Sequence, residues 1–566
     1  MSTPLARLSI VLFAATLSAS AETSELWGKT GEKWSPTSRL PDFAFAGYRR
    51  GEEPYRLPQQ QISVKDHGAA GDGKTDDTQA FRAAIAAGAG RVIWVPPGRY
   101  LISDVLEIRT AATVLKGAGA EACTLVFQKS LESLRPNSTT TADGVPTSAW
   151  SWSGGLIDVQ GRTLTGGPAI PVAAARRGDT RLQVSGHSFK PGDDVLLTLT
   201  GDAAQTLIRY LYHDDPGDIS GLRSMKCQQA ARIVSTDADA IVVDRPLRFD
   251  LRPEWSPFIA SFAPDVTDVG IEGFTIEFPA EAYPGHFREQ GWNALQFGTN
   301  TAHCWARGLH IVNADNGVFV KGHFSTLEGI TIAAERARHD SAGMAGHHGL
   351  TMGGADGLCT GFVFETRFIH DLTLETGSIG NVFSKGRAVD LNLDHHRFAP
   401  YENLFTDLDA GAGTRLFESG GGPNRGRHSG AGATFWGIRS KTAQQWPENF
   451  GPDRMNLVGL KMRGSSSKKP EGRWIESIAP EKLDPPDLHL AMRQRRLGTT
   501  TIATSPAPQL RNWTSQDGKT IQAAFMGLKG ESLKLLVNGR EFDLPLSRLS
   551  IESQAQAREL EKLRRE

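Results

Sequence analysis

The sequence has few of the residues that mark small disulfide-stabilised or zinc-binding proteins. It contains four cysteines in 566 residues, and they lie far apart at Cys123, Cys227, Cys304 and Cys359. None forms a C-x-x-C pair or a cluster with histidines. This spacing excludes a disulfide scaffold and provides no zinc motif. We expect most of the cysteines to be buried packing residues.

The chain also lacks an excess of charge and, after its first residues, any long apolar run. Lys plus Arg is 62 and Asp plus Glu is 63, giving a formal net charge of −1. A nucleic-acid-binding protein should be basic, so nucleic acid is not an expected partner. No stretch after residue 21 is apolar enough to span a bilayer. Glycine is abundant, at 61 residues, which together with many β-branched residues favours a turn-rich β protein.

Residues 1–21 have the three features of an export signal. Arg7 is the positive residue, residues 8–17 form an apolar segment, and Ala19-Ser20-Ala21 matches an A-x-A cleavage site. The apolar segment is too short to cross a bilayer. We therefore expect a mature protein that starts at Glu22 and is secreted, periplasmic or at the outer surface.

The next two segments predict a leader and a cap. Residues 22–61 are irregular and rich in Pro, Arg and aromatics, as expected for an extended leader that packs along a larger body. After residues 71–78 a short amphipathic helix is expected, with Asp76 as its N-cap and Gln79 as the capping-box partner. A helix in front of a series of strands can cover the exposed end of a solenoid.

A recurring pattern of glycine, apolar, any, apolar predicts a β-solenoid. It occurs at Gly273, Gly308, Gly329 and Gly361, and similar strands follow at residues 381–383 and 403–405. The shortest intervals are 21 and 22 residues, and a coil of that size buries its apolar face only by stacking on its neighbours. A β-sandwich is the alternative, but it predicts hairpins and no fixed period.

The pattern divides the chain into units. We expect a β-helix body, a β insertion within it, an irregular segment with a linker, a small β-barrel built on Asp-Gly and Asn-Gly turns, and a charged tail that forms a solvated helix. Their expected bounds are, in that order, residues 62–463, about 173–248, 464–509, 510–552 and 553–566.

The stretch from Val64 to Tyr100 resembles the N-terminal motif of the pectate lyase-like superfamily, in particular its rhamnogalacturonase/epimerase-type branch. The matching residues are Gly71-Asp72-Gly73-Lys74-Thr75-Asp76-Asp77-Thr78, the helix after them, and Val95-Pro96-Pro97-Gly98-Arg99-Tyr100. The resemblance implies an all-β fold, a single-stranded right-handed parallel β-helix with an N-terminal capping helix. This family includes lyases, hydrolases and phage-tail depolymerases, and the motif serves caps and turns, so no catalytic residue is carried over.

The segment from Arg511 to Ile551 looks like a Sla-homology-domain-one type module, a small SH3-like β-barrel. The likeness rests on residues 513–515, 517–521 and 542–550. Eukaryotic relatives bind peptides. The resemblance leaves open whether this module binds an unknown peptide or surface partner, or serves only as an adhesion or spacer domain.

The densest polar region, residues 385–428, is where we expect a functional site. Alternation along a strand turns Leu391, Leu393 and His395 inward and their polar neighbours outward. A 22-residue step then predicts three vertical pairs: Lys385 with Asp407, Arg387 with Asp409, and His396 with Glu418. Such Asp/Arg stacks are equally well explained as structural ion pairs.

These residues yield a specific site prediction. The expected catalytic residues are Asp394, His396 and Glu418. The expected substrate-binding residues are Asp390, Asn392, Arg397, Arg415, Arg425, Arg427, His347 and His348. Trp305 and Trp436 could stack on sugar rings or pack in the core. No metal ligand is predicted.

Two mechanisms suit this set of side chains. A lyase needs a base next to an acidic proton and cations, either Arg and Lys or bound calcium, to stabilise an enolate. A glycoside hydrolase needs two carboxylates. A slight excess of Lys and Arg favours an anionic, uronic-acid-containing polysaccharide, with lyase chemistry first and hydrolysis second. Calcium stays open as a cofactor, and the alternative is a non-catalytic carbohydrate-binding or cell-surface β-helix.

Overall fold

The computed structural model describes residues 21–141, 144–223, 225–337, 343–498, 510–537 and 540–565. The expected export signal and the Asn538-Gly539 turn therefore lie outside the described residues, apart from Ala21 at the end of the signal. The chain divides into two compact units, Met1–Leu497 and Gly498–Glu566, which are taken separately. Among the helices of the described part, none is long and apolar enough to cross a membrane.

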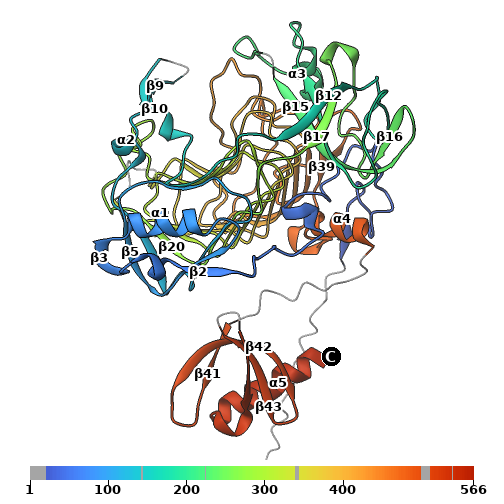
Figure 1. Cartoon of the computed structure of the whole chain (residues 1–566). Helices are drawn as coiled ribbons and strands as arrows, with labels where there is room; N and C mark the ends of the chain where they lie inside the picture. The colour runs from blue at the N-terminus through green and yellow to red at the C-terminus, as the bar shows by residue number, and fades with distance from the viewer. Residues whose placement is uncertain are drawn as a thin grey trace, which may run out of the picture. The chain divides into compact units, whose positions relative to one another are not determined.

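The first unit is a parallel β-helix whose coils stack along one axis (Figure 1). Its strands form three parallel ladders, and each coil contributes at most one strand to each ladder. The first ladder contains β2 (Gln61–Ser63), β4 (Val92–Val95), β7 (Val114–Gly117), β19 (Gly270–Glu272), β23 (Trp305–Arg307), β26 (Thr326–Glu328), β29 (Leu358–Thr360), β32 (Val382–Ser384), β35 (Leu404–Asp409), β36 (Thr434–Arg439), β37 (Asn456–Leu460) and β39 (Trp474–Glu476).

The other two ladders are shorter. The second contains β3 (Asp72–Asp76), β5 (Gly98–Ile102), β8 (Cys123–Phe127), β20 (Thr275–Glu277), β24 (His310–Val312), β27 (Thr331–Ala333), β30 (Val363–Phe364) and β33 (Arg387–Ala388). The third contains β6 (Leu106–Ile108), β11 (Ile157–Val159), β21 (Asn293–Phe297), β25 (Asn316–Val320), β28 (His348–Met352), β31 (His370–Leu374) and β34 (Leu393–His395).

Stacked apolar side chains fill the inside of the helix. In the first ladder Cys359, Phe383, Phe405, Phe435 and Leu457 follow one another in register, and all are buried. The rings of Phe383, Phe405 and Phe435 are stacked, with centroids 4.9 and 5.4 Å apart. Burying one such ring is worth roughly 1.5–3 kcal/mol, so the repeat itself stabilises the column. All four cysteines are buried and free, as expected of packing residues.

The glycines of the repeat turn the chain from the first ladder into the second. Gly273, Gly308, Gly329 and Gly361 all have positive φ, between 58° and 78°. An L-residue with a side chain adopts this conformation only with strain, which explains why the repeat uses glycine here. The predicted β-solenoid is therefore confirmed, and it extends past residue 463 because β39 still pairs in parallel with β37.

The N-terminal cap of the β-helix differs in detail from the sequence prediction. Helix α1 (Thr78–Ala87) buries Phe81 and Ala84 in the core, as a cap should. Its N-cap residue is Asp77 rather than Asp76. The Asp77 carboxylate instead accepts a hydrogen bond from the Gly71 backbone amide, which fixes the preceding glycine-rich turn.

The leader packs along the first ladder, as its composition suggested. Phe43 and Phe45 share an apolar cluster with Leu404 and Trp436, together with helix α4 (Leu488–Leu497). Trp436 is fully buried there and donates a hydrogen bond to the Pro485 carbonyl. Trp305 is likewise buried, with its ring stacked on that of Tyr55. Neither tryptophan is therefore exposed for sugar stacking.

The β insertion is an antiparallel sheet with the order β12-β17-β14-β15-β16-β13. It covers more of the chain than the predicted residues 173–248, because its first strand in sequence begins at Thr165 and its last ends at Phe262. Its strands are β12 (Thr165–Pro171), β13 (Arg181–Gln183), β14 (Asp194–Thr200), β15 (Lys226–Thr236), β16 (Ala240–Val243) and β17 (Phe258–Phe262), and a short helix α3 (Thr206–Leu211) follows β14.

A buried ion-pair network joins the insertion to the β-helix. Arg245 and Arg248 of the insertion both bind the carboxylate of Asp356, at 2.7 and 3.0 Å. Arg248 also binds Glu402 at 3.1 Å, and Arg177 binds the same Glu402 at 2.9 Å. The opposite charges compensate one another inside the protein. Removing one partner would leave a buried charge uncompensated and would lower the free energy of unfolding strongly.

The second unit has a four-stranded antiparallel sheet in the order β41-β42-β43-β44. The strands are β41 (Leu510–Thr514), β42 (Thr520–Lys529), β43 (Ser532–Val537) and β44 (Arg540–Pro545). The charged tail forms helix α5 (Ile551–Arg565). Ala557 of this helix is buried against Trp513 and Leu533, so the tail packs on the sheet instead of being fully solvated. Closure into an SH3-like barrel stays a prediction.

Candidate functional site

Several histidines lie close together at the ends of β28, β31 and β34, the last three strands of the third ladder. His348 and His370 are the first residues of β28 and β31 and pair directly in the ladder register. His347 precedes β28, His396 follows β34, and His286 comes from the loop between β20 and β21. We call these five residues, His286, His347, His348, His370 and His396, the histidine cluster.

The rings of the cluster are in contact. Ring centroids are 4.6 Å apart for His286 and His347, and 4.1 Å for His347 and His348. His370 lies 4.9 Å from His348 and 5.2 Å from His396 by the same measure. Five imidazoles from four parts of the chain thus meet at one place. The sequence predicted His347, His348 and His396 as site residues, but it did not predict His286 or His370 as such.

Asp394 is the carboxylate at the centre of this arrangement. It is fully buried, and its Oδ2 accepts a hydrogen bond from Nδ1 of His396 at 2.9 Å. The same oxygen lies 3.5 Å from Nδ1 of His370, and Oδ1 accepts a hydrogen bond from the Gly420 amide at 2.8 Å. Burial alone would raise the pKa of Asp394, but the two histidines and these hydrogen bonds hold it well below its usual range.

Electrostatics separate the histidines into two kinds. Burial would lower the pKa of His396, but the charge and hydrogen bond of Asp394 outweigh it and raise that pKa. Burial lowers the pKa of His286 and of His370 to about 4. Burial also lowers the pKa values of His347 and His348 well below the usual range of histidine. The pKa of His396 is thus shifted upward, in the opposite direction to the pKa values of the other four imidazoles.

Glu289 is a second buried carboxylate, on the other side of the cluster. Tyr283 donates a hydrogen bond to its Oε1 at 2.6 Å, and Nδ1 of His347 lies 3.3 Å from the same oxygen. Burial raises the pKa of Glu289 to about 7. Sequence reasoning missed Glu289, because it lies in a loop with no repeat to place it.

Glu418 is not part of the cluster, contrary to the 22-residue step. Its side chain is exposed, and it contributes only a backbone carbonyl, which accepts a hydrogen bond from Asn392 at 2.5 Å. Gly420 faces the rings instead: a Cβ there would lie 2.7 Å from Cε1 of His396. The step from Asp394 to the amide above it is 26 residues, because this coil continues into a loop instead of a strand.

Several predicted substrate-binding residues are buried and already form hydrogen bonds or ion pairs with other residues of the chain. Asp390 is buried and accepts hydrogen bonds from the amide and hydroxyl of Thr414. Arg415 is buried and binds Asp371 at 2.5 Å. The amide group of Asn392 is fully buried under the same loop. These three side chains stabilise the coil, and they are not placed to contact a ligand.

The remaining arginines line the loop after the cluster. Arg397 donates to the carbonyls of Gly421 and Gly426 and lies 3.1 Å from Nε2 of His428. Arg425 lies over the ring of Phe398. Arg427 pairs with Asp215 of the insertion at 2.7 Å. Arg397 and Arg425 remain partly exposed, and Arg397 directly follows His396 in the chain.

The predicted 22-residue stacking of Lys or Arg over Asp is confirmed as a register pairing in one case, and whether that pair forms an ion pair stays a prediction. Arg387 and Asp409 are register partners in β33 and β35. Asp407, however, pairs with Arg439 at 2.9 Å, and Lys385 pairs with Asp487 at 3.6 Å. The difference arises because β36 and the segment before α4 supply partners that the 22-residue step did not include.

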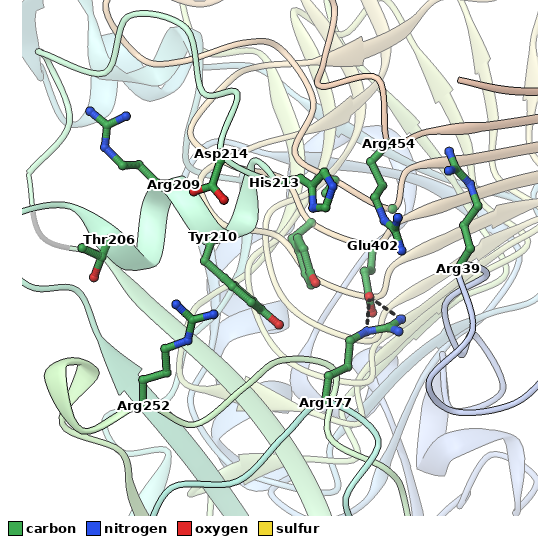
Figure 2. Close-up of a pocket in the computed structure, with 13 residues that line it drawn as sticks. Arg39, Arg177, Thr206, Arg209, Tyr210, His213, Asp214, Arg252, Glu402 and Arg454 are labelled. Atoms are coloured by element: carbon green, nitrogen blue, oxygen red, sulfur yellow. Dashed lines mark hydrogen bonds and ion pairs between the residues drawn. The ribbon is translucent and has the colours of Figure 1, made fainter. Parts of the chain in front are cut away.

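Apart from the histidine cluster, a cavity of about 340 Å³ lies between the insertion and the β-helix (Figure 2). Five arginines line it, from segments far apart in sequence, and this is why sequence reasoning missed it: Arg39, Arg177, Arg209, Arg252 and Arg454. Four of these guanidinium groups already have acidic or carbonyl partners, such as Glu402 for Arg177. The cavity therefore carries less unpaired charge than its composition suggests.

Two groups in the cluster have the ligand types of a metal site. His286, His347 and His370 form one, and His370, Asp394 and His396 form the other, with ligand atoms within 4.8 Å of one another. Calcium takes six to eight oxygen ligands, and neither group offers more than one carboxylate. These donors therefore do not fit calcium.

The fold and this site define a parallel β-helix protein with a histidine-rich cluster on its third ladder. Residues 61–159 match the family described as rhamnogalacturonase A/epimerase, pectate lyase-like. A pre-neck appendage protein of Bacillus phage B103 is 35% identical over 103 residues, which cover 18% of this chain and 11% of that protein. Alginate lyase 7 of Azotobacter vinelandii is 44% identical over 59 residues, 10% of this chain and 7% of that protein.

Among solved structures, the tailspike of Pseudomonas phage phi297 is similar at 13% identity and a TM-score of 0.30. The alignment covers 73% of this chain and 79% of the tailspike. The chain spans only a small fraction of the length of the curated relatives that it matches, 11% and 7% for the two described here.

Proposed function

We propose that this chain is an extracytoplasmic enzyme that cleaves an anionic, uronic-acid-containing polysaccharide by β-elimination, with His396 as its proton-transferring residue. The observation that carries the proposal is the hydrogen bond from His396 Nδ1 to the buried Asp394. The His396 side chain is 26% exposed, whereas that of Asp394 is inaccessible. A carboxylate behind an accessible imidazole fixes its orientation and tautomer, leaving Nε2 for a substrate.

The same geometry disfavours hydrolysis. A glycoside hydrolase needs two carboxyl groups that both reach the glycosidic bond. Asp394 and Glu289 are the carboxylates of the cluster, and the side chains of both are fully buried behind histidine rings. Glu418, the third expected acid, is turned away. Histidine, rather than a carboxylate, is therefore the group that can exchange a proton with the substrate.

The charge around His396 suits an acidic sugar. Arg425 lies close enough to act electrostatically on His396, and Arg397 lies in the same turn. A uronate requires such cations, because the carboxylate gains charge as its α-proton is removed. In this scheme neutral His396 removes the α-proton, the carbon–carbon double bond forms as the bond to the glycosidic oxygen breaks, and that oxygen takes up a proton from the protonated His396 or from water. The arginines neutralise the carboxylate of the reacting sugar.

The comparisons support the substrate class. The family matched by residues 61–159 is described as pectate lyase-like, and one curated relative is named an alginate lyase. Pectate and alginate are both polymers of uronic acids. The export signal expected in residues 1–21 agrees with a substrate found outside the cell.

A panel of glycans tests the proposal directly. The purified protein is incubated with uronic-acid polymers and neutral polysaccharides, and both ultraviolet absorbance of unsaturated uronate and new reducing ends are measured. An unsaturated product from a uronate polymer supports the proposal. Reducing ends without that product would indicate hydrolysis, and binding without cleavage would indicate the non-catalytic alternative; either result refutes it.

A further inference from the structure

We infer that His286, His347 and His370 form a binding site for a divalent transition-metal ion of the zinc class. The three residues each present one ring nitrogen, and these atoms lie within 4.8 Å of one another. The site goes beyond the proposed function, because it would bind its ion whether or not the chain cleaves a polysaccharide.

Unsatisfied buried nitrogens are the strongest evidence for a ligand. His347 is fully buried, and neither of its ring nitrogens has a hydrogen-bond partner among the described residues. Leaving such a polar group buried and unpaired costs about 1–3 kcal/mol, and a metal bond would remove that cost.

Carboxylates stand behind two of the three histidines. Oε1 of Glu289 lies 3.3 Å from Nδ1 of His347, and Oδ2 of Asp394 lies 3.5 Å from Nδ1 of His370. Histidines that bind metals usually direct their second nitrogen to a carboxylate, which fixes the ring and makes the ligand more basic. Tyr283 in turn holds Glu289 through a 2.6 Å hydrogen bond. The cluster therefore has both the ligands and the groups that orient them.

The donor set selects the metal class. Three neutral imidazoles suit zinc, copper, cobalt or nickel, and they do not suit magnesium or calcium. His286 is partly exposed while His347 and His370 are buried, so one side of the site is open to solvent. Zinc with three protein ligands and one open position has this type of environment. Tetrahedral donors on zinc lie roughly 3.4 Å apart, so small ring rotations would close the site.

The test uses metal binding, not activity. The full chain is stripped with a chelator and titrated with Zn²⁺ by calorimetry, and with Co²⁺ to record its ligand-field absorption. We expect one ion per chain, tetrahedral Co²⁺ bands and a higher Tm with Zn²⁺ than without. His286→Ala should weaken Zn²⁺ binding at least tenfold, and because His286 is partly exposed this variant should keep the fold. Glu289→Gln should weaken it 10- to 100-fold.

Two controls separate this site from its neighbours. His67→Ala, a histidine outside the cluster, should bind Zn²⁺ as tightly as the unchanged protein. His396→Ala should also retain the ion, because His396 belongs only to the second group of ligands. Loss of the ion in His396→Ala with retention in His286→Ala would overturn the assignment. Absence of stoichiometric binding in the folded, stripped protein would overturn it as well, whatever the glycan panel shows.

Discussion

Oδ2 of Asp394 accepts a hydrogen bond from Nδ1 of His396, which lies two positions further along the chain and directly after β34, at 2.9 Å. In a regular strand two such residues point to the same side, so the pair is already aligned by the backbone. The tertiary structure adds the burial of Asp394 under the Gly420 loop and next to His370. The pair becomes an oriented acid–base group only in that setting.

The first prediction concerns this pair. His396→Ala should reduce turnover of the glycan at least a hundredfold, since it removes the proton-transferring group. Asp394→Asn should also reduce it strongly, because an amide can hold the His396 ring in the wrong tautomer. Initial rates and circular dichroism of both variants check this. Near-normal turnover by folded His396→Ala would remove this residue from the mechanism.

The second prediction uses the close approach of Gly420 to the rings. A Cβ at Gly420 would lie 2.7 Å from His396 Cε1 and 3.0 Å from His370 Cε1, so Gly420→Ala should displace both rings. A shift of about 1 Å near reacting groups can cost a hundredfold in rate, and we expect a loss of roughly 10- to 100-fold. Gly166→Ala is the matched control, since its Cβ would meet only Ala263 at an ordinary 3.4 Å.

The third prediction concerns the buried network that joins the insertion to the helix. Asp356→Ala leaves Arg245 and Arg248 buried without their shared partner and should lower the free energy of unfolding by about 3–5 kcal/mol. Asp237→Ala breaks an exposed pair with Arg181 and should cost less than about 1 kcal/mol. Urea denaturation of both variants makes the comparison. Equal losses would show that the network does not behave as a buried one.

The fourth prediction is a pH dependence of stability from buried neutral histidines. Burial lowers the pKa of His323, His395 and His489 to about 4, and that of His303 to about 3. Unfolded histidine takes up its proton near pH 6.5, so between that pH and about 4 the unfolded state binds more protons. The stability that these four histidines contribute should therefore be complete above pH 6.5 and be lost as the pH drops through this window.

Substituting one of these histidines tests its contribution to the slope of the unfolding free energy against pH. Each such histidine contributes up to about 1.4 kcal/mol per pH unit. His395 is packed among Phe405, Phe435 and Phe450, so His395→Phe should retain the core and flatten the slope. Denaturant titrations at several pH values measure this. An unchanged slope in His395→Phe would contradict the assignment of His395 as a buried neutral group.

The fifth prediction is that the two compact units are thermodynamically independent. Truncation after Thr500 removes the sheet β41–β44 and α5, which have their own apolar core around Trp513, Leu533 and Ala557. The Tm of the β-helix should change by less than about 2 °C, because each unit has an apolar core of its own. Loss of the cooperative transition in the truncated protein would place the boundary elsewhere.

Local sequence determined the parts of this protein that repeat. The glycine pattern at Gly273, Gly308, Gly329 and Gly361 fixed the turns, because each position requires a positive φ. Alternation placed His395 inward and Asp394 and His396 on the other side, since side chains along a strand alternate. The β-helix, its cap and the insertion could all be predicted from such short-range rules.

Only the tertiary structure decided which residues meet across irregular loops. A constant 22-residue step brought Glu418 to His396, but an irregular coil put Gly420 there, and a shift of this kind changes every partner. His286 and Glu289 reach the cluster from one loop and His370 from another coil, and no local pattern encodes that meeting. A repeat sequence specifies the direction of each side chain, whereas loop lengths between repeats decide its neighbours.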